Sequence, residues 1–178
     1  LRTRLRLHWG GPRPALLGYL GVTLLLFNLL LLVDDSSGRF RRYTLPTITV
    51  ILMLMWQLHY VHRSFIYPFQ IRVKPGDSTP LLVILMGSLY CGINGYLNGS
   101  YISNYADHLN QQWLTDPRFV LGVALFGFGY YLNKRSDSIL RNLRASSTTG
   151  YQIPQGFAFR YVSMPNYLGE LITWSGFA

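Results

Sequence analysis

The sequence predicts an all-α protein, a polytopic bundle of transmembrane helices. Two uncharged runs, Ala15–Val33 and Leu81–Tyr101, are each long enough to cross about 30 Å of hydrocarbon as a helix. The composition agrees, because 49% of the residues are hydrophobic, only 13% are charged, and the mean hydropathy is +0.19. These values exclude an ordinary soluble domain.

Further apolar segments predict the remaining spans. Thr44–Leu58 and Phe119–Leu132 are shorter and carry no charge, so either could cross a membrane if extended or tilted. A fifth apolar segment opens at Tyr167 and runs to the end of the chain. Because the chain begins with Leu1 and stops inside an apolar segment, we expect a fragment truncated at both ends. We expect residues 1–178 to form one partial membrane domain.

The formal charge of +9 is the next feature to explain. With five spans, residues 1–14, 62–80 and 133–165 share one side and hold 12 of the 16 Lys and Arg. Basic loops mark the cytoplasmic side of membrane proteins, so we expect no nucleic-acid partner. We expect an integral protein of a bacterial inner membrane or the endoplasmic reticulum. The single Cys91 excludes a disulfide framework.

Turn and loop signals separate the later segments. Asp116-Pro117 can begin a helix, since Pro suits a first helical turn. Ser146–Gly150 is expected to end the helix that contains Arg141 and Arg144. Tyr151–Tyr161 is punctuated by Pro and Gly and predicts a loop.

A candidate substrate site lies in the segment 56–69. On a helix, Trp56, Tyr60, Arg63 and Tyr67 fall within a stripe of about 60°. Two phenols, an indole and a guanidinium on one face can donate hydrogen bonds to a substrate oxygen, with Trp56 and Arg63 lining the site. The alternative is an aromatic belt at the membrane interface with a snorkelling Arg.

His59 and His62 raise the question of a metal. Membrane hydroxylases gather many His ligands, whereas this chain has four His and no carboxylate near these two. We therefore expect no metal.

Asp137, Arg141 and Arg144 share a predicted helix face at spacings i, i+4 and i+7. The two guanidinium groups offer planar donor forks to phosphate. The alternative is a solvated, ion-paired helix face. No glycine-rich nucleotide motif is present, so a nucleotide would have to be held by side chains and loop backbone.

Asn166 and Glu170 stack at i, i+4 where the last apolar segment begins. An ionisable side chain in such a segment favours a functional role. The alternative is a charge that complements the positive end of the helix.

Taken in order, these segments resemble the steroid 5α-reductase family of membrane enzymes, which includes plant and bacterial relatives. The matching blocks are L-H-Y-V-H-R-S-F-I-Y-P at 58–68, I-N-G-Y-L-N-G at 93–99, W-L-T-D-P-R-F at 113–119, S-D-S-I-L-R-N-L-R at 136–144, T-G-Y-Q-I-P-Q-G at 149–156 and Y-V-S-M-P-N-Y-L-G-E at 161–170. The resemblance implies about seven transmembrane helices and NADPH bound from the cytosolic side. It also implies reduction of the C4=C5 double bond of a 3-oxo-Δ4 steroid or a sterol-like enone lipid.

The resemblance also assigns roles to particular residues. Tyr60 matches the family tyrosine that donates to the substrate carbonyl oxygen. The implied cofactor residues in the later blocks are Asn133, Ser136, Asp137, Arg144, Tyr151, Asn166 and Glu170. Arg72 and Lys74 match the basic loop that follows the tyrosine helix.

The chain departs from the family pattern in three places. The family carries a catalytic Glu in an E-L-P motif one helix before the tyrosine, and here no Glu precedes Tyr60. We therefore expect that a helix is missing between Gly38 and Thr47. In addition, Gln152 stands where a basic residue is common, and Arg135 where relatives often carry His.

The residues leave three functions open. The first is an NADPH-dependent steroid reductase. The second is a related membrane enzyme, either an enoyl-thioester reductase or an isoprenylcysteine-type methyltransferase. The third is an inactive homologue that lacks the catalytic Glu.

Overall fold

The computed structural model describes residues 21, 24–25, 28, 47–71, 78–146 and 152–178. These belong to two compact units, Leu1–Asn110 and Gln111–Ala178, and each unit is considered by itself. Most of the expected span Ala15–Val33 lies outside the described residues, as do nearly all residues of the suspected helix gap between Gly38 and Thr47. The prediction of one membrane domain therefore stays a prediction.

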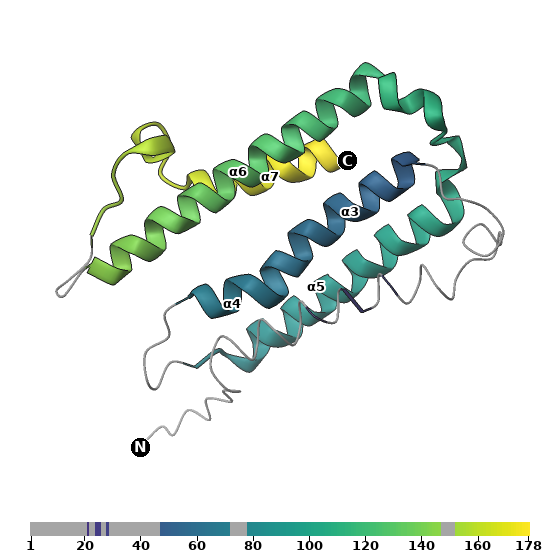
Figure 1. Ribbon diagram of the computed structural model, residues 1–178. Helices are drawn as coiled ribbons and strands as arrows, with labels where there is room; N and C mark the ends of the chain where they lie inside the picture. The colour runs from purple at the N-terminus through teal and green to yellow at the C-terminus, as the bar shows by residue number, and fades with distance from the viewer. Residues whose placement is uncertain (1–20, 22–23, 26–27, 29–46, 72–77, 147–151) are drawn as a thin grey trace. The chain divides into compact units, whose positions relative to one another are not determined.

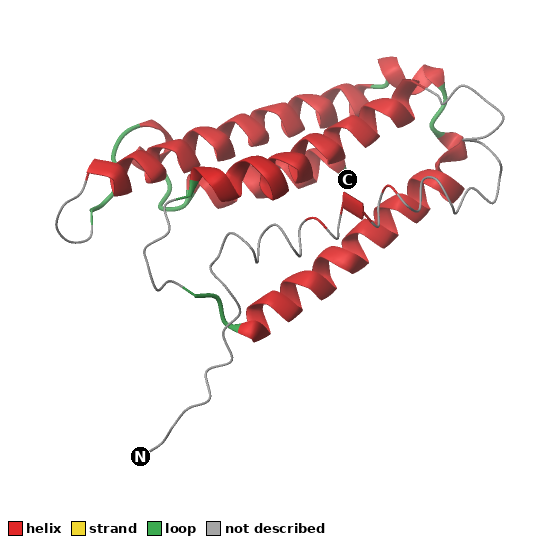
Figure 2. Cartoon of the chain, turned by 60° about the horizontal axis from the view of Figure 1, so that its bottom comes forward, coloured by secondary structure: helices red, strands yellow, loops and turns green. Residues whose placement is uncertain are grey.

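The described residues confirm the all-α fold, since they form helices and contain no strand (Figures 1 and 2). The α-helices are α3 (Thr47–Val61), α4 (Tyr67–Gln70), α5 (Leu81–Ser100), α6 (Pro117–Ser146) and α7 (Pro165–Phe177). Short turns join or extend them: π-helical η1 (His62–Ile66) and η2 (Tyr101–Tyr105), and 3₁₀ turns η3 (Ala106–His108), η4 (Gln111–Thr115) and η5 (Phe157–Arg160).

A π-helical turn interrupts the segment that carries the candidate substrate site. The backbone N–H of Tyr67 donates to the carbonyl of His62, five residues back, and Pro68 follows at once. Pro68 has no N–H to donate, and its ring crowds the carbonyl four residues earlier, at Ser64. The wider turn accommodates that proline and rotates the residues after it, so the uniform 100° projection does not hold across it.

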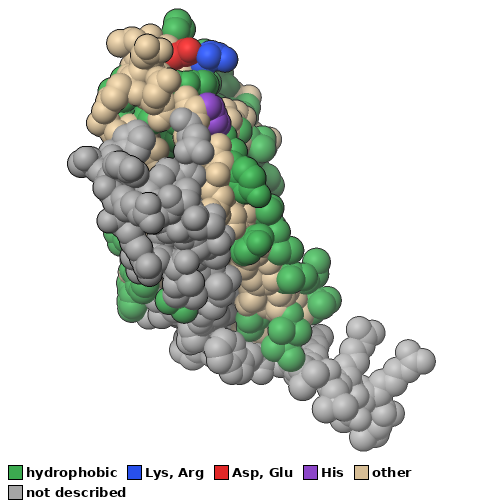
Figure 3. All heavy atoms as spheres, turned by 90° about the vertical axis from the view of Figure 1, so that its right-hand side faces the viewer, with side chains coloured by type: hydrophobic (Ala, Val, Ile, Leu, Met, Phe, Trp, Pro, Cys, Tyr) green, Lys and Arg blue, Asp and Glu red, His purple; other side chains and the backbone are tan. Residues whose placement is uncertain are grey.

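Helix α5 is the described helix that is long and apolar enough to cross a membrane, over Leu81–Ile102. Its buried residues form one narrow face: Ile84, Cys91, Gly95 and Gly99. Most of its other large apolar side chains are exposed: Leu82, Val83, Leu85, Met86, Leu89, Tyr90, Ile93, Tyr96 and Leu97. Figure 3 shows hydrophobic side chains gathered along the described part of one face. Such an apolar surface is what contact with lipid requires.

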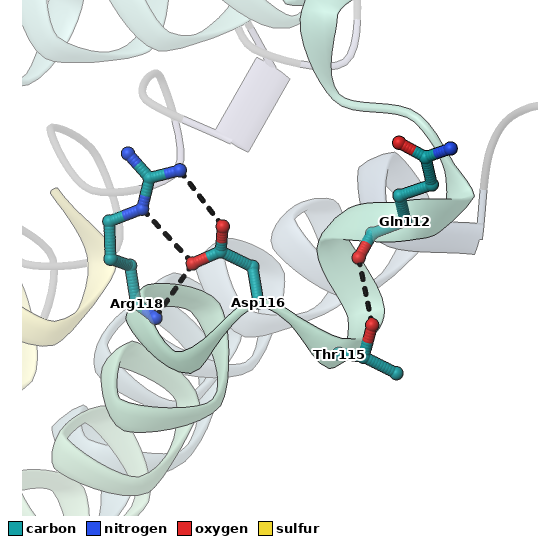
Figure 4. Close-up of polar contacts among 4 residues, drawn as sticks. All are labelled: Gln112, Thr115, Asp116 and Arg118. Carbon is teal, nitrogen blue, oxygen red and sulfur yellow. Dashed lines mark hydrogen bonds and ion pairs between the residues drawn. The ribbon is translucent and has the colours of Figure 1, made fainter.

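Helix α6 starts where the Asp116-Pro117 pair predicts. Oδ1 of Asp116 accepts a 2.8 Å hydrogen bond from the backbone N–H of Arg118, and the Arg118 guanidinium pairs with both carboxylate oxygens (Figure 4). These contacts satisfy a free amide of the first turn. The side-chain hydrogen bond from Arg118, followed by the backbone one, lowers the pKa of Asp116 from 3.8 to about 2.

Helices α6 and α7 pack with their backbones in contact. A Cβ atom added to Gly169 would lie 2.5 Å from the backbone nitrogen of Asn133 and 2.7 Å from the carbonyl oxygen of Gly129. A Cβ atom on Gly176 would lie 2.5 Å from the carbonyl oxygen of Gly122. The two pairs run in opposite order along the chain, so the helices are antiparallel. Glycine is required here because any side chain would force the helices apart.

The helix boundaries extend the sequence prediction in one respect. Phe119–Leu132 was expected as an apolar span, and Arg141 and Arg144 were expected on a helix that ends at Ser146–Gly150; α6 carries both in one unbroken helix from Pro117 to Ser146. No proline or turn-forming pair separates the two parts, so the i to i−4 hydrogen bonds continue. Polar groups of the block around Asn133 are thereby fixed on the same rigid rod as the apolar half.

Candidate functional site

The first candidate cluster lies in the Leu1–Asn110 unit and centres on Tyr60. Trp56 is fully buried, Tyr60 is 5% exposed, and their ring centroids are 4.2 Å apart. The His59 ring meets Tyr60 edge-on at 5.1 Å. These side chains are enclosed rather than facing lipid, so the alternative of an interfacial aromatic belt does not describe Trp56 and Tyr60.

The other half of the predicted stripe forms its own pair. The Arg63 guanidinium lies over the Tyr67 ring, 5.1 Å from its centroid. Both residues lie in or directly after the π-helical turn, where the predicted geometry does not apply. The structure therefore pairs Trp56 with Tyr60 and Arg63 with Tyr67.

Sequence reasoning missed Asn94, which lies opposite Tyr60 on α5. The Tyr60 hydroxyl donates a 2.9 Å hydrogen bond to Oδ1 of Asn94. A signal for it existed, because Asn94 is a polar residue within an apolar span and within the family block at 93–99. What the sequence could not show is which helix that amide faces.

The second candidate cluster lies where α6 meets α7. The Asn133 amide donates two 2.9 Å hydrogen bonds, one to the carbonyl oxygen of Asn166 and one to Oε1 of Glu170. Asn133 is 2% exposed. The structure thus brings together three of the predicted cofactor residues from segments more than thirty positions apart in sequence.

The position of Glu170 bears on its two interpretations. Helix α7 begins at Pro165 and has no acidic residue in its first turn. Glu170 therefore lies in the second turn, where the field of the helix end has largely decayed. Its carboxylate instead accepts from the buried Asn133 amide, which favours a role in a site over simple helix-end stabilisation.

Ser136 and Asp137 continue the buried face of α6. Ser136 is fully buried and its hydroxyl donates to the carbonyl oxygen of Leu132 at 2.7 Å. Asp137 is 5% exposed, so this face is not the open, solvated helix surface of the alternative interpretation. Burying a carboxyl is costly unless other groups compensate it, which favours a structural or ligand-binding role.

The buried polar atoms of α6 that have no hydrogen-bond partner among the described residues include Oδ1 of Asn133, an acceptor, and Nη1 of Arg141, a donor. Buried polar atoms are nearly always paired, so two such atoms on one helix indicate a site for something else. The side chain of Arg144, the next basic residue on this helix face, lies outside what the structure describes.

A pocket of about 760 Å³ opens beside the second cluster. Its walls come from the C-terminal half of α6, the following loop and the start of α7: Leu140, Leu143, Gln152, Ile153, Pro154, Phe159, Arg160, Tyr161, Val162, Ser163, Met164, Asn166 and Tyr167. The loop turns at Gly156 and Phe157, with φ of 78° and 47°. A positive φ is strained for Phe, and such strain often accompanies binding sites. The volume lies in the range of small-molecule sites.

Three predicted cofactor residues, Arg72, Lys74 and Tyr151, lie outside the described residues. His59 and His62 are described. Within the described part of the chain, no three His, Cys, Asp or Glu side chains gather into a group that could hold a metal ion.

The helical fold and the long apolar helix α5 fit a membrane protein, and buried polar side chains on α6 supply a candidate site within it. Residues 77–178 match the family model described as 3-oxo-5-alpha-steroid 4-dehydrogenase. The chain belongs to this family, and the resemblance to steroid 5α-reductases is confirmed.

Curated relatives give the extent of the similarity. The chain is 45% identical over 128 residues to 3-oxo-5-alpha-steroid 4-dehydrogenase 1 of Bos taurus, and 46% over 128 residues to its Homo sapiens counterpart. It is 42% identical over 142 residues to 3-oxo-5-alpha-steroid 4-dehydrogenase 2 of Sus scrofa. These matches cover 72%, 72% and 80% of this chain and 49%, 48% and 54% of the relatives. The chain therefore spans about half the length of the curated relatives it matches.

Proposed function

We propose that this chain is the part of a membrane steroid reductase that binds NADPH and activates the substrate carbonyl. The reaction is reduction of the C4=C5 double bond of a 3-oxo-Δ4 steroid or a sterol-like enone. The observation that carries the proposal is the match to relatives named for this chemistry. The basic loops, and with them the cofactor side, are assigned to the cytosol on their charge.

The α6–α7 cluster supports a dinucleotide on its chemistry. Oδ1 of Asn133 offers an acceptor to an amide, and Nη1 of Arg141 offers a donor to phosphate; neither atom has a partner in the described residues. Asn166 joins this cluster to the pocket wall. The residues proposed to hold NADPH are Arg72, Lys74, Asn133, Ser136, Asp137, Arg144, Tyr151, Asn166 and Glu170.

Tyr60 is the proposed catalytic residue of this chain. Its hydroxyl donates a hydrogen bond to the 3-oxo oxygen, where negative charge develops as the double bond is reduced. A bound NADPH would supply a hydride to the β-carbon of the enone, and a proton from water would complete the reduction at the α-carbon. A donor aimed at the developing charge in an enclosed, apolar setting lowers the activation barrier by about 3–4 kcal/mol. The Trp56 indole holds the phenol ring at a tilted contact, and Arg63 is proposed to line the substrate site.

Preference for NADPH over NADH follows from charge. Five cations lie in the basic loop, within the matching block at 136–144 or directly before it: Arg72, Lys74, Arg135, Arg141 and Arg144. A pyrophosphate alone needs fewer, and the 2′-phosphate of NADPH accounts for the excess.

The test is an assay on membranes that contain the protein expressed from its complete reading frame. With NADPH and a 3-oxo-Δ4 steroid, we expect oxidation of the cofactor and a product that has lost the conjugated enone. NADH should bind at least tenfold more weakly, because a charged contact to phosphate contributes about 1.5–3 kcal/mol.

Parallel reactions separate the alternatives. Reduction of an enoyl thioester without reduction of the steroid would assign the second function. Methyl transfer from S-adenosylmethionine would assign the methyltransferase. NADPH binding without turnover on any substrate would assign an inactive homologue.

A further inference from the structure

We infer that Asn94 is a positioning residue for Tyr60, and that its amide switches between accepting from and donating to the Tyr60 hydroxyl. The inference rests on the proposed function and deepens it. It starts from the 2.9 Å hydrogen bond in which the Tyr60 hydroxyl donates to Oδ1 of Asn94 and joins α3 to α5.

The surroundings of Asn94 favour a hydrogen bond to Tyr60. Ile93 and Tyr96, close to Asn94 on α5, are 52% and 55% exposed. Asn94 itself is half-buried, and its amide faces Tyr60. An amide in an apolar helix is costly, so it stays where its hydrogen bond offsets that cost. The Tyr60 ring has a second contact, with the tilted Trp56 indole. The two contacts together hold the phenol in place, while rotation of its O–H bond can still redirect the proton.

The chemistry of an amide suits both stages of the proposed reaction. Without substrate, the hydroxyl donates to Oδ1 of Asn94. When the hydroxyl donates to a substrate carbonyl, Oη still has lone pairs, and rotation of the Asn94 side chain presents its NH₂ group as the donor. The hydroxyl then receives one hydrogen bond while it gives another. Hydrogen bonds in such a chain strengthen each other, so Oη becomes better able to stabilise the charge on the substrate oxygen.

The experiment is a double-mutant cycle in the full-length protein, with NADPH and a 3-oxo-Δ4 steroid. Asn94→Leu should lower kcat by about tenfold, the scale of one lost hydrogen bond that acts in the transition state, while the Kd for NADPH stays within about twofold. Asn94→Ser, whose side chain is too short to reach Oη, should give the same loss. Either residue is tolerated within an apolar helix, so folding is expected to survive.

Asn98→Leu is the matched control. Asn98 lies one turn further along α5, and its amide donates to the Asn94 backbone carbonyl rather than to Tyr60. This variant should keep kcat near the wild-type value. In a Tyr60→Phe background, Asn94→Leu should lower kcat by less than about a further twofold, because the hydroxyl on which Asn94 acts is already gone.

The outcomes separate the inference from the proposed function. Wild-type kcat in both Asn94 variants, or a full additional loss in the Tyr60→Phe background, would overturn the inference alone, since a purely structural role is additive. A wild-type protein that reduces no steroid would remove the proposed function and the inference with it.

Discussion

The Tyr60 cluster and the Asn133 cluster hold polar groups inside apolar helices in opposite ways. In the Tyr60 cluster, the phenol is held by the tilted indole of Trp56, with ring centroids 4.2 Å apart, and by a hydrogen bond to Asn94 on α5. At Asn133 the helix backbones touch at glycines, and one amide reaches two acceptors on α7. The first arrangement leaves one donor adjustable, whereas the second fixes several groups at once.

This difference matches the two tasks of the proposed reaction. A group that must donate to a substrate oxygen and then release it needs some freedom in its hydrogen bonding. A cofactor that binds through many contacts needs a rigid, preorganised frame. Changes near Tyr60 should therefore alter turnover, and changes near Asn133 should alter stability and cofactor affinity.

The sharpest test of the first half is Tyr60→Phe. Removing only the hydroxyl keeps the ring that contacts Trp56, so packing is preserved and the loss falls on the transition state. We expect the steroid-reduction rate to fall at least tenfold. The largest loss we expect is the factor that corresponds to about 3–4 kcal/mol of activation free energy, the effect of one oxyanion donor. The Kd for NADPH should stay unchanged. Stopped-flow measurement of NADPH oxidation and a cofactor titration give the two values.

Tyr90→Phe is the control for that measurement, since Tyr90 is 65% exposed on α5. It loses the same atom and should turn over like the wild type. Equal rates for wild type, Tyr60→Phe and Tyr90→Phe would reduce Tyr60 to a packing residue.

The second test addresses the rigid cluster through Asn133→Leu. The substitution removes the donor that satisfies both the Asn166 carbonyl and the Glu170 carboxylate, and it buries an apolar group in their place. We expect a loss of about 1–3 kcal/mol in unfolding free energy and weaker NADPH binding, with a smaller effect on kcat. Thermal denaturation in detergent and a binding titration measure these effects.

Asn142→Leu, an exposed position on the same helix, provides the comparison. It should change neither quantity appreciably. If the two Leu variants behaved alike, the hydrogen bonds seen at Asn133 would carry no weight in stability or binding.

The third test separates backbone contact from polar contact. Gly169→Ala places a methyl group against the Asn133 and Gly129 backbones, which cannot move aside without parting α6 from α7. We expect a loss of about 1–3 kcal/mol in stability. Gly127→Ala on α6 is the matched change, because a Cβ atom there meets nothing within 4 Å.

Gly127→Ala should be neutral or stabilise the protein slightly, since alanine loses less conformational entropy in a helix. A melting temperature that falls equally in both variants would show that the glycine contacts are not what holds the helix pair.

The sequence predicted these elements unequally. Uncharged length was enough to predict α5, and Asp116-Pro117 was enough to predict where α6 begins, because both signals are local. The stripe through Trp56, Tyr60, Arg63 and Tyr67 was predicted on a uniform α-helix, and the π-helical turn before Pro68 divides it. That proline was visible in the sequence as the cause.

The candidate sites show the same limit more clearly. Asn166 and Glu170 could be paired from their spacing, but Asn133 was assigned from the family resemblance, since nothing local indicates which helix its amide meets. Asn94 escaped for that reason: its partner is 34 positions away. Contacts between distant helices depend on helix rotation and glycine packing, which one sequence does not encode in any short pattern.

The smallest effect is expected at the ion pair of Asp116 with the exposed Arg118, where α6 begins. Asp116 has a folded-state pKa of about 2 against an ordinary 3.8, because Arg118 donates to its carboxylate. The pKa is lowered, so the contribution of Asp116 to stability is complete above pH 3.8 and is lost as the pH falls through 2.

Asp116→Asn keeps a side-chain oxygen for the Arg118 amide but removes the charge. We expect the melting temperature of Asp116→Asn to lie slightly below that of the wild type at pH 6, and the difference to shrink toward pH 2. Because every other carboxyl is common to both proteins, this difference in melting temperature isolates Asp116. The gap at pH 6 should be smaller than that of Asn133→Leu, since the Arg118 side chain is 74% exposed and water screens the pair. A gap as large as that of Asn133→Leu, or one that widens as the pH falls, would contradict both the lowered pKa and the contrast between exposed and buried polar groups in this unit.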